Sequence, residues 1–347
     1  MEHAVLVTGG AGYIGSHTVR QLVAAGHRVV VLDNLSTGHR WAVAPQATLV
    51  VGNAGDQALV RALIGEHGVR AVVHFAGSIV VPESVVDPLK YYGNNSGVSR
   101  DLIETCLETG VERFVFSSTA AVYGMPDQLP ASETAPTRPI NPYGRSKLIT
   151  EWMLEDVAAS GAASGFRHVI LRYFNVAGAS GDGTLGQATE NATHLIKVAC
   201  EAACGARDKV TVFGTDYPTA DGTCIRDYIH VDDLSLAHLD ALRYLAQGGA
   251  SDTFNCGYGR GFSVREVLGM VEKVSGMKLR IEEGARRAGD AAELFADSAK
   301  IRRALGWRPQ DDDLGVICAS AYRWEARLRR MPEQGSRDAG LHKVVLR

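Results

Sequence analysis

The sequence lacks the paired-cysteine patterns that hold metal ions or build disulfide frameworks. Its six cysteines form no Cys-x-x-Cys pair, and no histidine stands at zinc-site spacing from them. We therefore predict no metal site and no disulfide scaffold. No apolar run approaches the length of a membrane span, and an apolar strand pattern starts within a few residues of Met1. We expect no membrane helix, no signal peptide and a cytoplasmic location.

An excess of charge of either sign is also missing. The formal net charge of the 347-residue chain is -3, so nothing indicates nucleic acid or an anionic membrane as a partner. Internal repeats and low-complexity tracts are absent. The hydrophobic share of 46% fills a substantial core. The length indicates two domains, or one large doubly wound domain with an added lobe.

A glycine array follows the first apolar run. Ala4–Thr8 has the composition of a buried strand, and Gly9, Gly12 and Gly15 follow it before a helix that begins near Tyr13. Such a loop lets the backbone approach a pyrophosphate at a helix N-terminus. A second run at 28–32 ends in Asp33, where an acid binds ribose hydroxyls and repels a 2′-phosphate. This pattern predicts NAD; the alternative is a glycine-rich turn beside a capping aspartate.

Short apolar runs alternate with helical stretches through the first half of the chain. Further strands are predicted at 48–51, 71–75, 114–117 and 168–171. This alternation predicts an α/β fold: a Rossmann-type doubly wound parallel sheet, with a smaller C-terminal α/β substrate lobe. Ligands bind beyond the carboxyl ends of such strands. Those ends here carry Gly9, Asp33, Gly52, Asn53, 75–77 and 117–119.

The character of the chain changes near Ala177. We expect a cofactor domain at 1–176, a substrate lobe at 177–330 from which some segments return to the first domain, and a tail at 331–347. The lobe is predicted to contain a helix at 195–206, a strand at 210–213, a charged turn at 226–233 and a helix after Ser263. Glu266 stands three residues after Ser263, as a capping box requires.

A tyrosine and a lysine stand one helical turn apart. Tyr143 and Lys147 share a helix face, and an ammonium beside a phenol favours the phenolate, so the pair suits proton transfer. Alone, this spacing is common on surface helices. Thr119, 24 positions earlier, follows a predicted strand and offers a hydroxyl at the same edge. The alternative interpretation of Thr119 is an ordinary capping or strand-end threonine with no part in the chemistry.

Taken together, these motifs resemble the extended short-chain dehydrogenase/reductase family, and within it the nucleotide-sugar 4-epimerases. The resemblance runs from about residue 4 to residue 308 and rests on segments 8–17, 32–35, 74–77, 91–95, 143–147, 171–175, 216–219 and 226–231. It implies bound NAD, a UDP-sugar substrate and a homodimer formed through helices around 83–109 and 142–160. The implied reaction interconverts UDP-glucose and UDP-galactose through a 4-keto sugar, with transient hydride transfer to NAD.

The resemblance also implies a function for individual residues. Tyr143 is the acid/base at the sugar 4-hydroxyl, Thr119 relays or orients that proton, and Lys147 holds the nicotinamide ribose and lowers the tyrosine pKa. The implied cofactor contacts are Gly9, Gly12, Tyr13, Ile14, Gly15, Asp33, Asn34, Asn53, Ala54, Phe75, Ala76, Gly77, Asn94, Ser117, Tyr143, Lys147 and Tyr173. The implied substrate contacts are Asn175, His194, Leu195, Thr211, Phe213, Arg226, Tyr228, Arg287, Asp290 and Leu294.

Several residues depart from the family pattern. Ile79 stands where a lysine often contacts the cofactor phosphates, Asn53 replaces an aspartate that reads the adenine amino group, and His194 replaces an asparagine. Leu294 occupies the position that limits space around the sugar C2 substituent. A leucine here does not decide whether the enzyme accepts N-acetyl sugars, so UDP-N-acetylhexosamine and UDP-pentose remain alternative substrates.

Other activities are less well supported by the residues. A 4,6-dehydratase or decarboxylase carries acidic groups directly after the Thr119 position, and this chain has Ala120-Ala121 there. A net NAD-dependent nucleotide-sugar dehydrogenase remains an alternative and would release NADH. A non-catalytic NAD-binding protein is the alternative of a different class.

Overall fold

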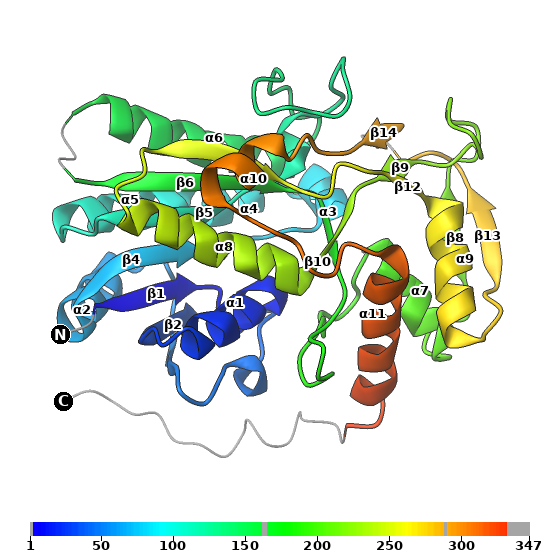
Figure 1. The fold of residues 1–347 in the computed structure, drawn as a ribbon, viewed down its shortest axis with the longest axis horizontal. Coiled ribbons are helices and arrows are strands. Elements are labelled where there is room, and N and C mark those ends of the chain that lie inside the picture. The colour runs from blue at the N-terminus through cyan, green and yellow to red at the C-terminus, as the bar shows by residue number, and fades with distance from the viewer. Residues whose placement is uncertain (1–2, 162–164, 288–289, 332–347) are drawn as a thin grey trace.

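The computed structural model describes residues 3–161, 165–287 and 290–331, and a sheet of seven parallel strands lies at its centre (Figure 1). The order is β3-β2-β1-β4-β5-β6-β11. The order grows outward from β1 in both directions, so the sheet is doubly wound as predicted. The strands are β1 Ala4–Thr8, β2 Val29–Asp33, β3 Thr48–Val51, β4 Val69–His74, β5 Arg113–Ser117, β6 Arg167–Tyr173 and β11 Asp252–Cys256.

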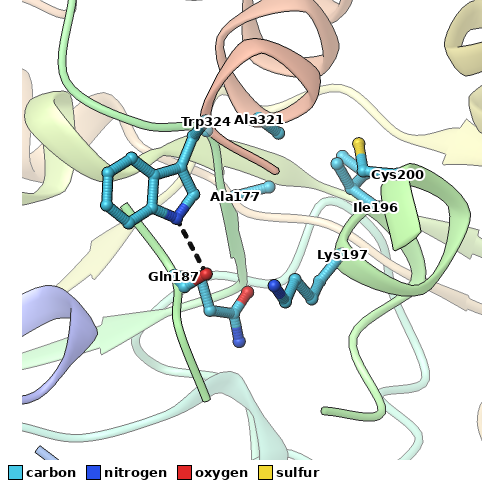
Figure 2. Close-up of a pocket in the computed structure, with 8 residues that line it drawn as sticks. Ala177, Gln187, Ile196, Lys197, Cys200, Ala321 and Trp324 are labelled. Atoms are coloured by element: carbon cyan, nitrogen blue, oxygen red, sulfur yellow. Dashed lines mark hydrogen bonds between the residues drawn. The ribbon is translucent and has the colours of Figure 1, made fainter. Parts of the chain in front are cut away.

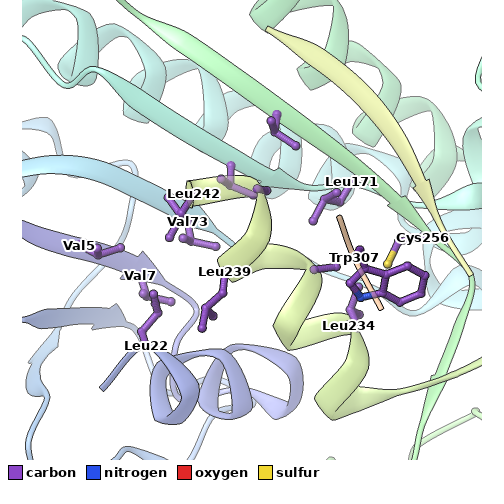
Figure 3. Close-up of a cluster of buried hydrophobic side chains, with 14 of the residues drawn as sticks. Val5, Val7, Leu22, Val73, Leu171, Leu234, Leu239, Leu242, Cys256 and Trp307 are labelled. Atoms are coloured by element: carbon purple, nitrogen blue, oxygen red, sulfur yellow. The ribbon is translucent and has the colours of Figure 1, made fainter. Parts of the chain in front are cut away.

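Helices cover both faces of this sheet because its strands are apolar on both faces. Val5 and Val7 pack on the side of α1 (Tyr13–Ala24), α8 (Val231–Ala246) and α10 (Ala299–Leu305). Leu6 packs on the other side, beneath α2 (Gln57–His67), α5 (Val98–Glu108) and α6 (Pro142–Ala159). Figure 3 shows the first of these cores, where α8 brings Leu234, Leu239 and Leu242 toward the strands.

The predicted strands of the first half are confirmed. β1 and β3 have the predicted bounds, and β4, β5 and β6 start one or two residues earlier than expected. β11 was not predicted: it comes from the second half of the chain and pairs in parallel with β6, from Asp252↔Val169 to Cys256↔Tyr173. Its short, mixed sequence carries little strand signal, and the open edge of β6 supplies the pairing partner.

A smaller lobe packs around three other helices, α7 Leu195–Ala203, α9 Val264–Ser275 and α11 Leu314–Leu328. α7 and β8 (Val210–Phe213) confirm the predicted helix and strand, although the helix ends three residues early. The Ser263 hydroxyl accepts from the Glu266 amide at 3.1 Å and Glu266 caps in return, so the capping box is confirmed. The remaining strands are β7 Asn175–Ala177, β9 Ile225–Arg226, β10 Tyr228–His230, β12 Phe262–Ser263, β13 Ile281–Gly284 and β14 Glu293–Leu294.

The predicted charged turn at 226–233 was wrong. This segment contains the end of β9, all of β10 and the start of α8 at Val231. The Asp227 carboxylate is buried and accepts backbone N–H bonds from Tyr258, Gly259 and Ala296. Asp232 and Asp233 lie in the first turn of α8, where acids favour a helix. The charges therefore satisfy backbone donors and stabilise a helix start.

Short helical elements connect the strands of the large sheet. They are η1 Arg40–Ala42, α3 Val81–Val86, α4 Pro88–Tyr91, the π-helix η2 Tyr92–Gly97 and η3 Ala120–Val122. Within the described ranges, none of the helices combines the length and apolar character needed to cross a bilayer. Apart from Met331, the predicted tail at 331–347 lies outside the described residues.

Candidate active site

The glycine array forms a tight backbone cradle at the end of β1. Gly9 has a φ of 72°, and a Cβ atom there would lie 2.6 Å from the Ala76 nitrogen. A Cβ atom on Gly15 would lie 2.2 Å from the Gly9 oxygen. α1 starts at Tyr13 with Gly12 as its N-cap and has no side-chain cap, which suits a phosphate at this helix end. This cradle fits the pyrophosphate of a dinucleotide.

Asp33 ties the glycine loop to the end of β2. Its carboxylate accepts hydrogen bonds from the Ala11 amide at 2.9 Å and the Leu35 amide at 2.8 Å. A carboxylate has further lone pairs, so the same group retains acceptor capacity for ribose hydroxyls. The neighbouring Asn34 oxygen accepts from the Ser36 amide at 3.0 Å.

The ends of β3 and β4 continue the same edge. Asn53 is exposed and its side-chain oxygen accepts from the Gly55 amide at 2.8 Å, whereas Ala54 is buried. A hollow also opens beside the glycine loop, and it includes two aromatic residues that the sequence patterns did not single out, His39 and Trp41. Its lining consists of Ala11, Gly12, Tyr13, Ser16, Thr37, His39, Trp41, Ala42, Gly186, Ala188 and Thr189.

The loop after β4 is joined to the π-helix. Asn94 donates to the Ser78 hydroxyl at 2.9 Å, and Asn95 accepts from the Ser78 amide at 2.7 Å. A Cβ atom on Gly77 would lie 3.0 Å from the Asn95 side-chain oxygen and 3.8 Å from the Lys147 ammonium. Phe75, Ala76 and Gly77 are thereby brought next to the catalytic helix. Position 79 carries an isoleucine that is 42% exposed, so its side chain offers no positive charge to the cofactor phosphates.

The Tyr/Lys pair lies at the start of α6. Asn141 caps this helix by accepting from the Gly144 amide at 2.8 Å, and Pro142 opens the first turn. Tyr143 and Lys147 are 7% and 3% exposed. The Lys147 ammonium donates to the Ser117 carbonyl at 2.8 Å, which joins the helix to the end of β5.

Thr119 meets the tyrosine from the end of β5. Its hydroxyl accepts from the Ala121 amide at 3.1 Å and is close enough to the Tyr143 phenol to favour its phenolate form. The Ser117 hydroxyl donates to the Tyr173 hydroxyl at 3.0 Å. The structure thus brings Thr119, Tyr143, Lys147, Ser117 and Tyr173 together at one edge of the sheet.

Burial controls the electrostatics of this group. It raises the pKa of Tyr143, and the nearby Thr119 hydroxyl lowers that pKa by less. The expected lowering by Lys147 does not prevail, because burial dominates and the ammonium is directed at the Ser117 carbonyl. Burial lowers the pKa of Lys147 to about 8, against the opposing effect of Glu151. Burial therefore disfavours the charged form of both groups: it keeps the Tyr143 phenol protonated and makes proton loss from Lys147 easier.

The predicted substrate contacts gather on the short strands of the second lobe. β10 pairs with β7, so Tyr228 lies opposite Asn175, and β14 pairs with β9, so Leu294 lies opposite Arg226. Leu294 also packs against the apolar cluster that contains Ala120. This contact joins the predicted gate for the sugar to the segment that follows Thr119.

Two arginines of this group share one acidic neighbour. The Arg287 side chain donates to the Asp290 carboxylate at 3.1 Å, and Arg226 lies 3.9 Å from the same carboxylate. The Arg287 guanidinium also lies over the Phe213 ring, 4.6 Å from its centroid. Thr211 is on the same strand, β8, as Phe213. These residues form a cationic and aromatic surface suited to a nucleotide.

His194 lies at the start of α7, directly before Leu195. Its side chain is 3.0 Å from the Gln187 amide nitrogen, and burial lowers its pKa. Gln187 lines the cavity in Figure 2 with Lys197 and Trp324, whose indole donates to the Gln187 carbonyl at 2.9 Å. Tyr143 does not line this cavity. Gln187 is a neighbour of the proposed substrate contact His194 that the sequence patterns did not single out.

Comparison with known proteins agrees with this geometry. The model of the NAD dependent epimerase/dehydratase family matches residues 5–257. A UDP-glucose 4-epimerase of Azospirillum brasilense is 55% identical over 336 residues, covering 97% of this chain and 96% of that protein.

Two solved structures extend the similarity to the fold. The UDP-glucose 4-epimerase of Brucella ovis, in complex with NAD, has 46% identity and a TM-score of 0.90, covering 93% of this chain and 98% of that one. The UDP-Glc/GlcNAc 4-epimerase of Campylobacter jejuni has 53% identity and a TM-score of 0.81, covering 94% and 99%. With its glycine cradle, Asp33 and the buried Tyr143/Lys147 pair in place, this chain belongs to the NAD dependent epimerase/dehydratase family.

Proposed function

We propose that this chain is a UDP-glucose 4-epimerase, which interconverts UDP-glucose and UDP-galactose with NAD as a resident cofactor. One observation carries the proposal: Thr119, Tyr143 and Lys147 converge beside the strand ends that carry the dinucleotide cradle. Similarity to UDP-glucose 4-epimerases over nearly the whole chain supports the choice of substrate.

The residues at the sheet edge would hold NAD in a defined order. Gly9, Gly12 and Gly15, with Tyr13 and Ile14, would hold the pyrophosphate, and Asp33 would accept hydrogen bonds from the adenosine ribose. The other proposed cofactor contacts are Asn34, Asn53, Ala54, Phe75, Ala76, Gly77, Asn94, Ser117, Lys147 and Tyr173. When bound, NAD supplies a hydride acceptor and donor for C4 of the sugar.

Tyr143 is the proposed acid/base. Its phenol lies against Thr119, which provides a hydrogen bond to the proton that moves between the 4-hydroxyl and the tyrosine. Lys147 is held by the Ser117 carbonyl, where its charge favours the phenolate once the site is filled. The same tyrosine would return the proton to the sugar oxygen, and because NAD would give back the hydride it took, the reaction would be redox-neutral overall.

The second lobe is proposed to bind the UDP group. Arg226 and Arg287 suit the diphosphate because guanidinium groups fork two phosphate oxygens, and Asp290 aligns both. Phe213 offers a partly exposed ring for the base. The remaining proposed contacts are Asn175, His194, Leu195, Thr211, Tyr228 and Leu294.

The N-acetylated sugars form a second candidate substrate class. Leu294 lies on β14 between Arg226 and the cluster with Ala120, next to the proposed sugar site. The similarity to a UDP-Glc/GlcNAc 4-epimerase favours testing these sugars directly. The acidic pair needed by a dehydratase remains absent, because Ala120 and Ala121 stand after Thr119.

A homodimer is part of the proposal. α3, α4 and α6 pack together and leave Val86, Leu89 and Trp152 exposed by 86%, 79% and 52%. A second copy covering this apolar surface would remove it from water. We expect a dimer by light scattering that Leu89→Asp dissociates, while Met277→Glu in the other lobe does not. A monomeric wild-type protein would contradict the proposal.

We place this enzyme in the cytoplasm, where NAD and UDP-sugars are both available.

The test of the activity uses the purified protein and UDP-galactose without added NAD. Anomeric proton signals in NMR report conversion to UDP-glucose, and UDP-N-acetylglucosamine and UDP-xylose are assayed next. We expect an equilibrium mixture with no NADH release, and much slower conversion by Tyr143→Phe. Net NADH formation would instead indicate a dehydrogenase, and no turnover of any of these sugars with NAD supplied would overturn the proposal.

A further inference from the structure

A buried carboxylate continues the stripe formed by the catalytic pair. Tyr143, Lys147 and Glu151 stand at intervals of four residues along α6, so their side chains share one face of the helix. Glu151 is fully buried. A buried carboxylate is costly unless charges and donors surround it, so its partners indicate what it does.

Those partners link the helix to the segment that carries Thr119. Glu151 accepts a hydrogen bond from the Ser118 hydroxyl, and Ser118 directly precedes Thr119. Its carboxylate also accepts from Arg172 on β6, at 3.0 Å from Nε and 2.6 Å from Nη2. The carboxylate therefore fastens α6 to the ends of both β5 and β6.

The far end of the same segment is anchored to the same pair. Arg172 donates to the Tyr123 hydroxyl at 3.1 Å, and that hydroxyl donates to the Asn255 side-chain oxygen at 2.6 Å. Tyr123 directly follows η3, whose N-cap is Thr119. Ser118, Tyr123 and Asn255 have no measurable exposure. Thus both sides of Thr119 are held by contacts that lead back to Glu151 and Arg172.

We propose that Glu151 is a positioning residue of the active site: with Arg172 it holds the segment 118–123 so that Thr119 meets Tyr143, and it places a negative charge one helical turn from Lys147. The inference rests on the proposed epimerase function. It concerns a residue that touches neither the sugar nor the cofactor in that function, and whose effect passes through Thr119 and Lys147.

Few other charges face Lys147. His74 on β4 is buried, and burial followed by the lysine charge lowers its pKa to about 3, so it stays neutral in an assay. Tyr143 and Tyr173 have pKa values raised by burial. Glu155, one turn beyond Glu151, has a pKa raised by burial and then by Glu151. Arg172 carries positive charge, so Glu151 is the main negative group near the lysine.

The direct test is Glu151→Gln, which keeps the shape and removes the charge. We expect kcat for UDP-galactose to fall about tenfold, with KM within about twofold, because the reacting groups are displaced while the UDP site is not. Lys147 then lacks the negative charge that favours its protonated form, so it loses its proton more readily. The alkaline limb of the kcat profile therefore moves to lower pH.

Two further variants separate position, charge and stability. Ser118→Ala removes one contact and retains the carboxylate, so kcat should fall with no movement of the alkaline limb. Glu325→Gln is the matched control, because Glu325 is 1% exposed and pairs with Lys197 and Arg329 in the other lobe. It should lower stability without changing the pH profile.

A readout independent of turnover completes the test. In protein with ¹³C-labelled lysine, the NMR signal lost in Lys147→Arg identifies Lys147, and its titration should occur at lower pH in Glu151→Gln than in wild type. An unchanged titration together with an unchanged pH profile would overturn the inference. Absence of epimerase activity in the wild type would defeat the proposed function alone, since the titration still tests the charge effect. If Glu151→Gln does not fold, kcat of Arg172→Lys is measured in its place. This variant should bind the Glu151 carboxylate more weakly and have a lower kcat, and a normal kcat would contradict the positioning role.

Discussion

The two sides of the proposed crevice are built in different ways. On the side of β5 and α6, the reacting groups are buried and held by neighbours: Tyr143 is 7% exposed, and Lys147 donates to a backbone carbonyl at 2.8 Å. On the side of β9 and β14, Phe213 is 39% exposed and the Arg287 side chain 43%. These strands contain two residues each. The residues proposed for the chemistry are therefore preorganised on long elements, whereas those proposed to bind UDP lie on short and open ones.

This difference predicts different kinetic signatures for substitutions on the two sides. Loss of a preorganised group should lower kcat, because such groups act mainly in the transition state. Loss of a recognition group should raise KM first. Four experiments can break or sharpen the comparison.

The largest effect is expected for Tyr143→Phe. Removing the hydroxyl removes the proposed proton carrier, so kcat for UDP-galactose should fall about 1,000-fold. Binding of UDP, measured by calorimetry, should stay within about twofold of wild type. Substantial residual epimerisation by this variant would show that another group moves the proton.

The second effect is a loss of folding stability at acid pH, caused by buried histidines on β4, β6 and α8 of the large sheet layer. Burial lowers the pKa of His74 to about 3 and those of His168 and His238 to about 4, from an ordinary value of 6.5. Below pH 6.5 the unfolded chain binds protons that the native protein excludes, so stability falls as pH decreases toward 4. Each group contributes up to about 1.4 kcal/mol per pH unit.

Urea unfolding at pH 7, 6 and 5 measures this slope. His238 is a useful position for substitution, because its Nδ1 is 2.9 Å from the Leu234 carbonyl and its Nε2 lacks a partner in the described structure. His238→Gln should flatten the slope. Equal slopes for wild type and variant would place the proton-linked destabilisation elsewhere.

On the recognition side, Arg226→Gln should raise KM about thirtyfold with kcat within about threefold. A charge-assisted bond to phosphate is lost, while the groups at C4 keep their places. Arg286→Gln is the matched control, since Arg286 pairs with exposed Asp216 through a bond of 2.7 Å and has no proposed contact with substrate. If kcat of Arg226→Gln fell as far as kcat of Tyr143→Phe, the two sides would not differ in the way proposed.

The smallest effect concerns the sugar itself. Leu294→Ser should raise kcat/KM for UDP-N-acetylglucosamine relative to UDP-glucose about tenfold, because it removes apolar volume beside the proposed C2 pocket. Competition assays with both substrates measure the ratio directly. A constant ratio would mean that Leu294 does not limit substrate choice.

Local pattern predicted much of the cofactor half. The apolar run of β1, the spacing of Gly9 and Gly15, and the acid at the end of β2 are adjacent in sequence, so their arrangement follows from one βαβ unit. The Tyr143/Lys147 pair was predicted for the same reason, because helical spacing alone puts both side chains on one face.

The other half depends on long-range contacts that local pattern does not encode. β11 becomes a strand through its pairing with β6, and Asp227 has its buried place because of amides on two distant segments. Burial, which raises the pKa of Tyr143, likewise depends on the tertiary structure and not on the residue four positions away. Glu151 had the spacing that could have revealed it, but no sequence signal indicates Arg172 as its partner.

The most direct measurement of the central claim is the fate of a label at C4. UDP-galactose carrying deuterium at C4 is incubated with the purified protein in ordinary water without added NAD, and the UDP-glucose formed is analysed by mass spectrometry and NMR. The proposed chemistry predicts retention of the deuterium at C4, because the hydride returns to the carbon that it left. Exchange of the label with solvent, or release of NADH without UDP-glucose, would contradict a 4-epimerase with a retained cofactor.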